Sequence, residues 1–173
     1  MSEHSENMKF SSYGRTWMIV VRGRWGRALD RWLTRWTGFS VISLQYSLAG
    51  RRPYTPVLLF TTIGHKTGQL HTVVLPYVKF GDALVVIGSR GGGAYDPHWA
   101  HNVRADGRCW IRINRRDVAA VAHVAQGEER EQVYKEVSEQ KPNVPRYQER
   151  ASTFGREIPL VVIEPRAPAS FPV

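Results

Sequence analysis

The stretch TTIGHKTGQLH, Thr61 to His71, lies between two apolar runs of the chain. PVLLF, residues 56–60, leads into it, and TVVL, residues 72–75, leads out of it. Apolar and β-branched runs joined by a short segment with glycines are typical of two strands and their turn. Such a turn needs the glycines, but it does not need a lysine and two histidines. We interpret the charge as a site for an anion, because glycine turns expose backbone N–H groups and lysine adds a point charge. A plain solvated hairpin is the alternative.

Further strands and a few helices are expected around this turn. β-Branched and apolar runs predict strands at residues 57–62, 72–80, 83–87, 109–113, 118–124 and 158–164. Helical spacing and capping signals predict helices at residues 22–36, 97–105 and 128–140, and residues 141–153 are expected to form a loop. In the second helix, Asp96 is expected at the N-cap and Pro97 at the first helical position. Many short strands with few helices favour an all-β or α+β barrel over a parallel α/β sheet.

The length of 173 residues suits one domain with extensions. We expect a disordered lead at residues 1–14, an amphipathic helical region and linker at 15–54, a barrel domain at 55–165 and a tail at 166–173. The single cysteine, Cys109, permits no internal disulfide, and its position within a strand favours a small buried apolar role. His98 and His101 lack a third ligand at a sensible spacing, so no metal site is expected.

The net charge of +9 indicates an anionic partner, such as nucleic acid, a lipid surface or an acidic small molecule, or else a solubilising surface. The arginine-rich helix has no second helix in an arrangement that reads DNA, so no nucleic-acid partner is expected. The early apolar stretch Trp17–Val21 is too short for a signal peptide or a membrane span. The sequence therefore predicts a cytoplasmic protein.

Residues 22–36 show the pattern of a basic amphipathic helix that is rich in tryptophan. Spacings of three and four residues place five apolar side chains on one stripe, namely Trp25, Leu29, Trp32, Leu33 and Trp36. Arginines recur on the other faces, at Arg24, Arg27, Arg31 and Arg35. Two interpretations stay open: the stripe packs on the barrel or on a second subunit of a homodimer, or the helix lies on the inner face of the cell membrane.

Two other segments carry candidate binding residues. GSRGGG, Gly88 to Gly93, has four glycines in six residues, which lets a flat group lie against the main chain; a floppy surface loop is the alternative. Trp99 and Asn102 share one face of the short helix, although a lone tryptophan is more often part of the core. The turn at Gly64 joins strand to strand, which excludes the P-loop and Rossmann motifs, because these join strand to helix.

Three blocks follow one another in the chain: PVLLFTTIGHKTGQLHTVVLPY, VVIGSRGGGAYDPHWAHNVRADG and REIPLVVIEP. Together they resemble the deazaflavin-dependent nitroreductase family, which includes F420H2-dependent quinone reductases, over roughly residues 56–165. The resemblance implies an α+β, mainly β fold: a split β-barrel of the FMN-binding type with an N-terminal amphipathic helix and short peripheral helices. It also implies coenzyme F420, an 8-hydroxy-5-deazaflavin whose phosphate and polyglutamate tail would meet the charge at the turn.

The resemblance also implies which residues bind this cofactor. They are His65, Lys66, Thr67 and His71 at the turn, Ser89, Arg90, Gly91 and Gly92 after the third strand, and Trp99 and Asn102 on the short helix. Tyr147 is the expected proton donor, and Ser89 is expected to steady developing negative charge. Two positions depart from the family pattern. His65 stands where arginine is usual, and only Tyr147 fits a loop that is rich in tyrosine in well-studied members.

The predicted function is that of an F420-dependent oxidoreductase. Hydride would pass from the reduced deazaflavin to an electron-poor acceptor such as a quinone or a nitroaromatic, with the cofactor supplying the chemistry. One alternative is an F420-binding carrier or storage protein without turnover, which the tyrosine-poor loop favours. The other is an FMN-dependent split-barrel oxidoreductase, which would leave the basic turn unexplained.

Overall fold

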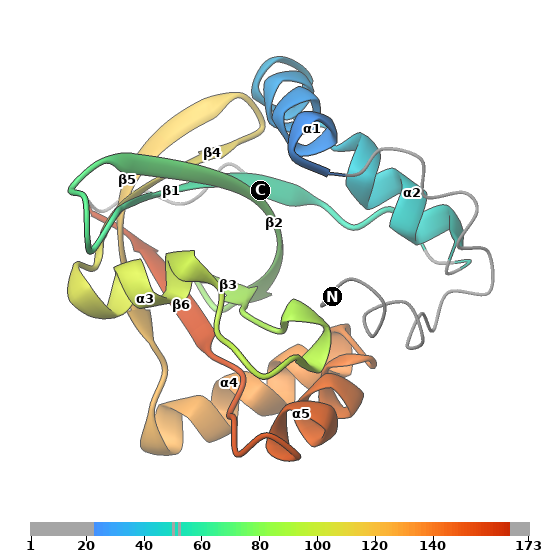
Figure 1. Ribbon diagram of the computed structural model, residues 1–173, viewed down its shortest axis with the longest axis vertical. Helices are drawn as coiled ribbons and strands as arrows, with labels where there is room; N and C mark the ends of the chain where they lie inside the picture. The colour runs from blue at the N-terminus through green and yellow to red at the C-terminus, as the bar shows by residue number, and fades with distance from the viewer. Residues whose placement is uncertain (1–22, 50, 52, 167–173) are drawn as a thin grey trace, which may run out of the picture.

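A computed structural model describes residues 23–49, 51 and 53–166, and in it six antiparallel strands close into a barrel (Figure 1). The order around the barrel is β1-β2-β3-β6-β5-β4. The strands are β1 Val57–Ile63, β2 Leu70–Phe80, β3 Ala83–Ile87, β4 Arg108–Ile113, β5 Arg116–Val124 and β6 Leu160–Pro165. This architecture confirms the predicted α+β, mainly β barrel. The lead expected at residues 1–14 and residues 167–173 of the tail lie outside the described residues.

The barrel interior is filled by apolar side chains from all six strands. Leu58 and Phe60 of β1 are fully buried, as are Val86 of β3 and Ile163 of β6. The Phe60 ring meets Trp99 edge to face at a centroid distance of 5.8 Å, which fixes the helix after β3 against β1. The interior is therefore a packed core, and any site must lie on the outside of the barrel.

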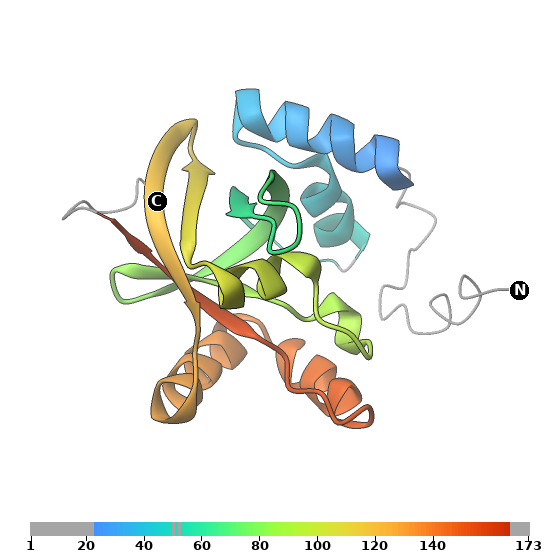
Figure 2. The ribbon, with the colours of Figure 1, turned by 60° about the vertical axis from the view of Figure 1, so that its left-hand side comes forward.

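In the described residues, five α-helices cover the outside of the barrel, and a short 3-10 helix, η3 Arg90–Gly92, follows β3. The five α-helices are α1 Gly23–Thr37, α2 Val41–Ala49, α3 His98–Ala105, α4 Gly127–Gln140 and α5 Val144–Ser152. The two views show α1 and α2 together at one side of the barrel and α4 and α5 together at another (Figures 1 and 2). α1 contacts β1 and β2, and α4 contacts β2 and β6, so both helix pairs flank the long strand β2.

The structure differs from the expected elements in three places. Residues 41–49 form α2, for which the sequence shows no signal that we recognised. Residues 144–152 form α5 inside the segment expected to be a loop; Pro145 lies in its first turn, where a missing N–H costs nothing. The expected N-cap role of Asp96 is wrong. Pro97 occupies the N-cap of α3 and no side chain caps it, because the Asp96 carboxylate is held by two arginines.

Candidate active site

A cavity of about 920 Å³ lies outside the barrel, between the α1–α2 pair, strand β2 and the connection from α4 to α5. Its apolar wall is formed mainly by Val57 of β1 and the β2 residues Val73, Val74, Leu75, Pro76 and Val78, together with Ile42 of α2 and Ile87 of β3. Its polar side is formed mainly by Arg27, Asp30, Arg31, Ser40, Ser43, Tyr46, Ser47, Tyr54, Thr55, Gln140, Lys141 and Asn143. A mostly apolar pocket of this size with a limited set of polar groups suits a flat organic molecule.

Three of the predicted site residues line this cavity. They are Ser89 after β3, Trp99 on α3 and Tyr147 on α5. The structure thus brings together side chains that are up to 58 residues apart along the chain. The remaining predicted residues, which are His65, Lys66, Thr67, His71, Arg90, Gly91, Gly92 and Asn102, do not line it.

The glycine turn is a tight and exposed cationic connection between β1 and β2. Gly64 N–H donates to the Gln69 carbonyl at 2.8 Å, and Gly68 N–H donates to the Gly64 carbonyl at 2.7 Å. A Cβ added at Gly64 would lie 2.8 Å from the His71 ring and from the Thr67 hydroxyl, so a larger residue there would force these two side chains to shift. Lys66 and His71 are exposed. Because β2 runs from this turn into the apolar wall of the cavity, the strand connects the two features.

Asn102 is the buried support of this turn. Its side-chain N–H donates to the Thr62 hydroxyl at 3.0 Å, while its side-chain oxygen accepts from the His65 backbone N–H at 3.1 Å. The same oxygen lies 2.8 Å from His65 Nδ1. These contacts satisfy the amide, which is only 3% exposed. Asn102 therefore holds the turn in place from beneath, and it shares α3 with Trp99 of the cavity.

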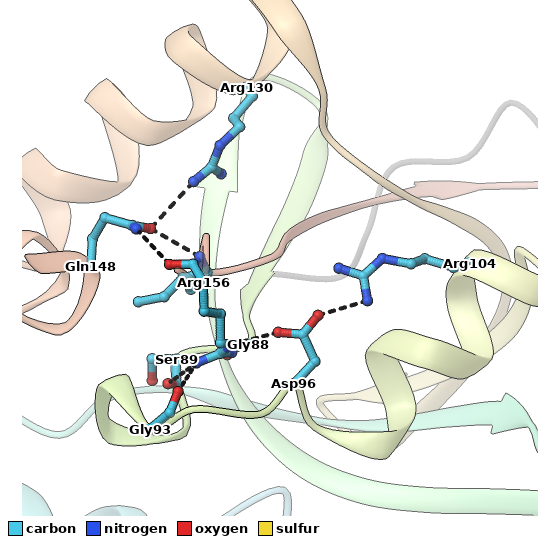
Figure 3. A network of polar contacts seen from close by, with 9 residues as sticks. Gly88, Ser89, Gly93, Asp96, Arg104, Arg130, Gln148 and Arg156 are labelled. Atoms are coloured by element: carbon cyan, nitrogen blue, oxygen red, sulfur yellow. Dashed lines mark hydrogen bonds and ion pairs between the residues drawn. The ribbon is translucent and has the colours of Figure 1, made fainter. Parts of the chain in front are cut away.

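The glycine-rich loop is held by an arginine that sequence reasoning missed. The Arg156 guanidinium donates to the carbonyls of Ser89 and Gly93, at 3.1 and 2.8 Å, and to the carbonyl of Gly88 (Figure 3). Its Nε donates to Asp96 Oδ1 at 2.6 Å. A rigid fork of five N–H donors can serve several acceptors at once, so one side chain fixes the whole loop.

Asp96 completes this arrangement as the shared acceptor of two arginines. Arg104 of α3 lies 2.7 Å from its second carboxylate oxygen. Burial acts to raise the pKa of Asp96, but the hydrogen bonds from Arg156 and Arg104 outweigh burial and lower it. The carboxylate is therefore charged at neutral pH and ties the loop to α3. Three carbonyls of the loop, those of Gly88, Ser89 and Gly93, need a donor, and the sequence alone does not indicate which residue supplies it.

Helix α5 also contacts the glycine-rich loop, at Gly91 and Gly92. Arg150 donates to the Gly91 carbonyl at 3.2 Å. Gly92 has a φ of +76°, and a Cβ added there would meet the Tyr147 carbonyl oxygen at 2.7 Å. The loop and α5 are thus in direct backbone contact, which only glycine permits at this position. This contact places Tyr147 beside Ser89 at the cavity.

The polar wall contributed by α1, α2 and the segment before β1 is the second feature that sequence reasoning missed. The Asp30 carboxylate, which is 2% exposed, accepts from the Ser40 hydroxyl at 2.8 Å and from the Ile42 N–H at 3.1 Å. Ser40 N–H in turn donates to the Tyr54 hydroxyl at 2.9 Å.

In the part of the chain that the structure describes, no cluster of three His, Cys, Asp or Glu side chains could hold a metal.

The chain is similar to known proteins over most of its length. Residues 40–165 match the sequence profile of the family described as F420H(2)-dependent quinone reductase. A protein of Mycobacterium tuberculosis named F420H(2)-dependent quinone reductase is 30% identical over 149 residues, which cover 80% of this chain and 99% of that protein.

Two solved structures resemble this chain. One, described as an F420-H2 dependent reductase, has a TM-score of 0.56 at 31% identity and covers 63% of this chain and 94% of its own. Another, described as a domain-swapped dimer, has a TM-score of 0.56 at 31% identity and covers 63% of this chain and 80% of its own. These two structures are therefore similar to this chain both in fold and in amino-acid sequence.

Proposed function

Because the chain belongs to the F420H(2)-dependent quinone reductase family, we propose that its cavity binds F420 and an acceptor together. The cavity carries this proposal, because it combines an apolar wall on β2 with Ser89, Trp99 and Tyr147. Its volume of about 920 Å³ is at the upper end of the range for small-molecule sites, which suits two stacked flat molecules. Reduced F420, when bound, supplies the hydride.

The charges near the cavity fit the acidic cofactor. Lys66 and His71 stand at the turn where β2 begins, and Arg90 is exposed in the glycine loop. We assign these three side chains, with His65 and Thr67, to the phosphate and glutamate groups of F420. We assign Asn102 an indirect role through the turn, since its buried side-chain amide binds Thr62 and His65.

The residues at the cavity supply the remaining functions. Trp99 limits the cavity on the side of α3. Gly91 and Gly92 do not line the cavity, and we assign them an indirect role: Gly92 lets the glycine loop pack against α5, which carries Tyr147. We assign Tyr147 the role of proton donor and Ser89 that of stabilising negative charge on the acceptor, and the lining of the cavity by both side chains supports these roles. The apolar β2 wall excludes water and favours an uncharged aromatic acceptor. A quinone has this chemistry, and nitroaromatics are acceptors of the same shape.

A turnover assay tests the proposal. Purified protein mixed with F420H2 and menadione is expected to oxidise one F420H2 for each quinone reduced, which the return of F420 absorbance reports. Binding of F420 without any oxidation would support the carrier alternative. Turnover with reduced FMN in place of F420H2 would support the FMN alternative. Neither alternative is favoured by the cavity or by the family match.

We further propose that α1 attaches the enzyme to anionic membrane. Trp25, Leu29, Trp32 and Trp36 are 79, 52, 59 and 63% exposed and follow one another at spacings of four, three and four residues. The buried face of α1 is instead polar, with Asp30 at 2% and Thr34 at 4% exposure. The stripe therefore faces away from the barrel, contrary to the interpretation that it packs there.

The charges around this stripe favour a lipid partner. Arg27, Arg31 and Arg35 are exposed on the same helix. An exposed apolar stripe flanked by arginines is typical of helices that lie in the membrane interface. A quinone dissolved in the bilayer would then reach the cavity, which Arg27 and Arg31 help to line. No helix in the described ranges is long and apolar enough to cross a membrane.

A further inference from the structure

Tyr54 is a tyrosine of the cavity whose position is fixed at both ends of its side chain. It lies between α2 and β1 and lines the cavity. Its hydroxyl oxygen accepts the Ser40 N–H at 2.9 Å. Its ring stacks on Phe39 with centroids 4.6 Å apart and planes 13° from parallel. A side chain held in this way is preorganised, so it loses little freedom when a ligand binds.

The hydroxyl of Tyr54 is a hydrogen-bond donor with its proton still available. A phenol oxygen can accept one bond and donate another. The oxygen accepts from Ser40, and no described residue accepts the O–H in return. Burial raises the pKa of Tyr54, and the nearby Asp30 carboxylate raises it further, against the opposing effect of the Ser40 hydrogen bond. The phenol is therefore protonated at neutral pH.

The surroundings of Tyr54 define the ligand that this donor suits. The cavity presents apolar side chains of β2 and Val57 together with this neutral hydroxyl. An uncharged ring with a carbonyl oxygen would place its faces against the apolar wall and its oxygen on the phenol. The buried Asp30 carboxylate, which shares Ser40 with Tyr54, disfavours a ligand that is already anionic when it binds, so an uncharged acceptor fits this point better.

We propose that Tyr54 donates a hydrogen bond to a carbonyl oxygen of the acceptor and that residues 40–47 and 53–55 form the acceptor side of the cavity. This inference rests on the proposed reductase function. Negative charge grows on that oxygen as the acceptor is reduced, so a fixed donor stabilises the transition state more than the ground state. Asp30 and Ser40 are positioning residues, because they orient Tyr54 and the start of α2.

The test uses the full chain and compares Tyr54→Phe with Tyr77→Phe. The first variant removes the hydroxyl and keeps the ring that stacks on Phe39. Tyr77 is also buried and its pKa is also raised by burial, but it does not line the cavity. For Tyr54→Phe, kcat/KM for menadione is expected to fall by about 10²-fold, as when an oxyanion-hole donor is lost. The Kd for F420 is expected to stay unchanged, and Tyr77→Phe is expected to retain kcat/KM.

A fluorinated tyrosine at position 54 tests the donor role through the pH dependence of kcat/KM, which would not change if Tyr54 were only structural. Fluorine lowers the phenol pKa with little change of shape. Since only the protonated phenol donates, the alkaline fall of kcat/KM should move to lower pH in this variant. An unmoved pH profile would overturn the inference even if Tyr54→Phe folds poorly.

The outcomes separate this inference from the proposed function. A wild-type protein that fails to bind F420 or to reduce menadione refutes the proposed function. A wild type that turns over, with kcat/KM unchanged in Tyr54→Phe, refutes the role of Tyr54 alone. A Tyr54→Phe variant that loses F420 affinity as strongly as kcat/KM would place the cofactor at this hydroxyl and would also overturn the inference.

Discussion

Arg156 Nε lies 2.6 Å from Asp96 Oδ1 and joins two segments that are 60 residues apart. The same guanidinium also binds carbonyls of the glycine loop, and Asp96 also binds Arg104 of α3. The ion pair thus connects the loop, α3 and the approach to β6. Removing one partner leaves the other buried with fewer compensating contacts, which is more costly than losing an exposed pair.

Arg156→Met is expected to lower the free energy of unfolding by about 3 kcal/mol, the low end for a broken buried pair, because Arg104 still contacts Asp96. The measurement is urea unfolding at pH 7. Arg108→Met is the matched control, since the ion pair of Arg108 with Asp106 is exposed and its loss should change the urea midpoint little. Equal losses of unfolding free energy in the two variants would show that the buried network stabilises the fold no more than an exposed ion pair does.

Asp96 is expected to make stability depend on pH in the acid range. Its folded pKa lies below the ordinary value of 3.8, so the folded state favours the charged form. Its contribution is complete above 3.8 and is lost as pH falls through the lowered folded value. Urea unfolding from pH 5 downward should show a smaller acid loss in Asp96→Asn than in the wild type. Identical slopes would contradict the assigned pKa direction.

Lys66→Ala is expected to weaken F420 binding while leaving stability within about 0.5 kcal/mol of the wild type. Lys66 is exposed at the turn, where removing it leaves no buried group unpaired. Fluorescence titration with F420 and thermal unfolding check the two parts. Lys79→Ala, which changes an exposed lysine in β2, is the control for the loss of one positive charge. A falling Tm with unchanged affinity would make Lys66 a structural residue.

The stripe of α1 is expected to carry vesicle binding. Changing Trp25, Trp32 and Trp36 together to Gln should abolish co-sedimentation with anionic vesicles at low salt and spare F420 binding. The control changes two exposed aromatic residues elsewhere, Tyr95 and Phe154, which are 72 and 53% exposed. Wild-type protein that ignores such vesicles contradicts the membrane proposal. Tryptophan-dependent dimers without vesicle binding would assign the stripe to a second copy of the chain.

The barrel could be predicted from the sequence because its signals are local. Each strand is a run of β-branched or apolar residues. The turn between β1 and β2 has its glycine at Gly64, and the residues that crowd this glycine, Thr67 and His71, lie within the next seven positions of the chain. α2 could not be predicted in the same way, because its buried face includes the polar residues Gln45 and Ser47. α5 is not predicted because Pro145 is interpreted as breaking a helix, whereas proline is compatible with the first turn of a helix.

The candidate site could be predicted only in part. Ser89, Trp99 and Tyr147 follow motifs in the sequence and meet at one cavity. Arg156 and Tyr54 act through partners far along the chain: Arg156 reaches Gly88 across 68 residues, and Tyr54 reaches Ser40 across 14. No periodicity or spacing rule connects such pairs, because tertiary packing brings them together. The exposure of the tryptophan stripe also depends on which face of α1 the barrel covers.

The relative affinity for F420 and FMN tests the central claim most directly. Both flavins would contact the apolar wall of the cavity. Only F420 carries several acidic groups, enough to interact with Lys66, His71 and Arg90 together. Titration of the full chain with each flavin, followed by ring fluorescence, should show much tighter binding of F420, and this preference should shrink as salt screens the exposed charges. Equal affinity for the two flavins, or an F420 affinity that does not respond to salt, would contradict the account.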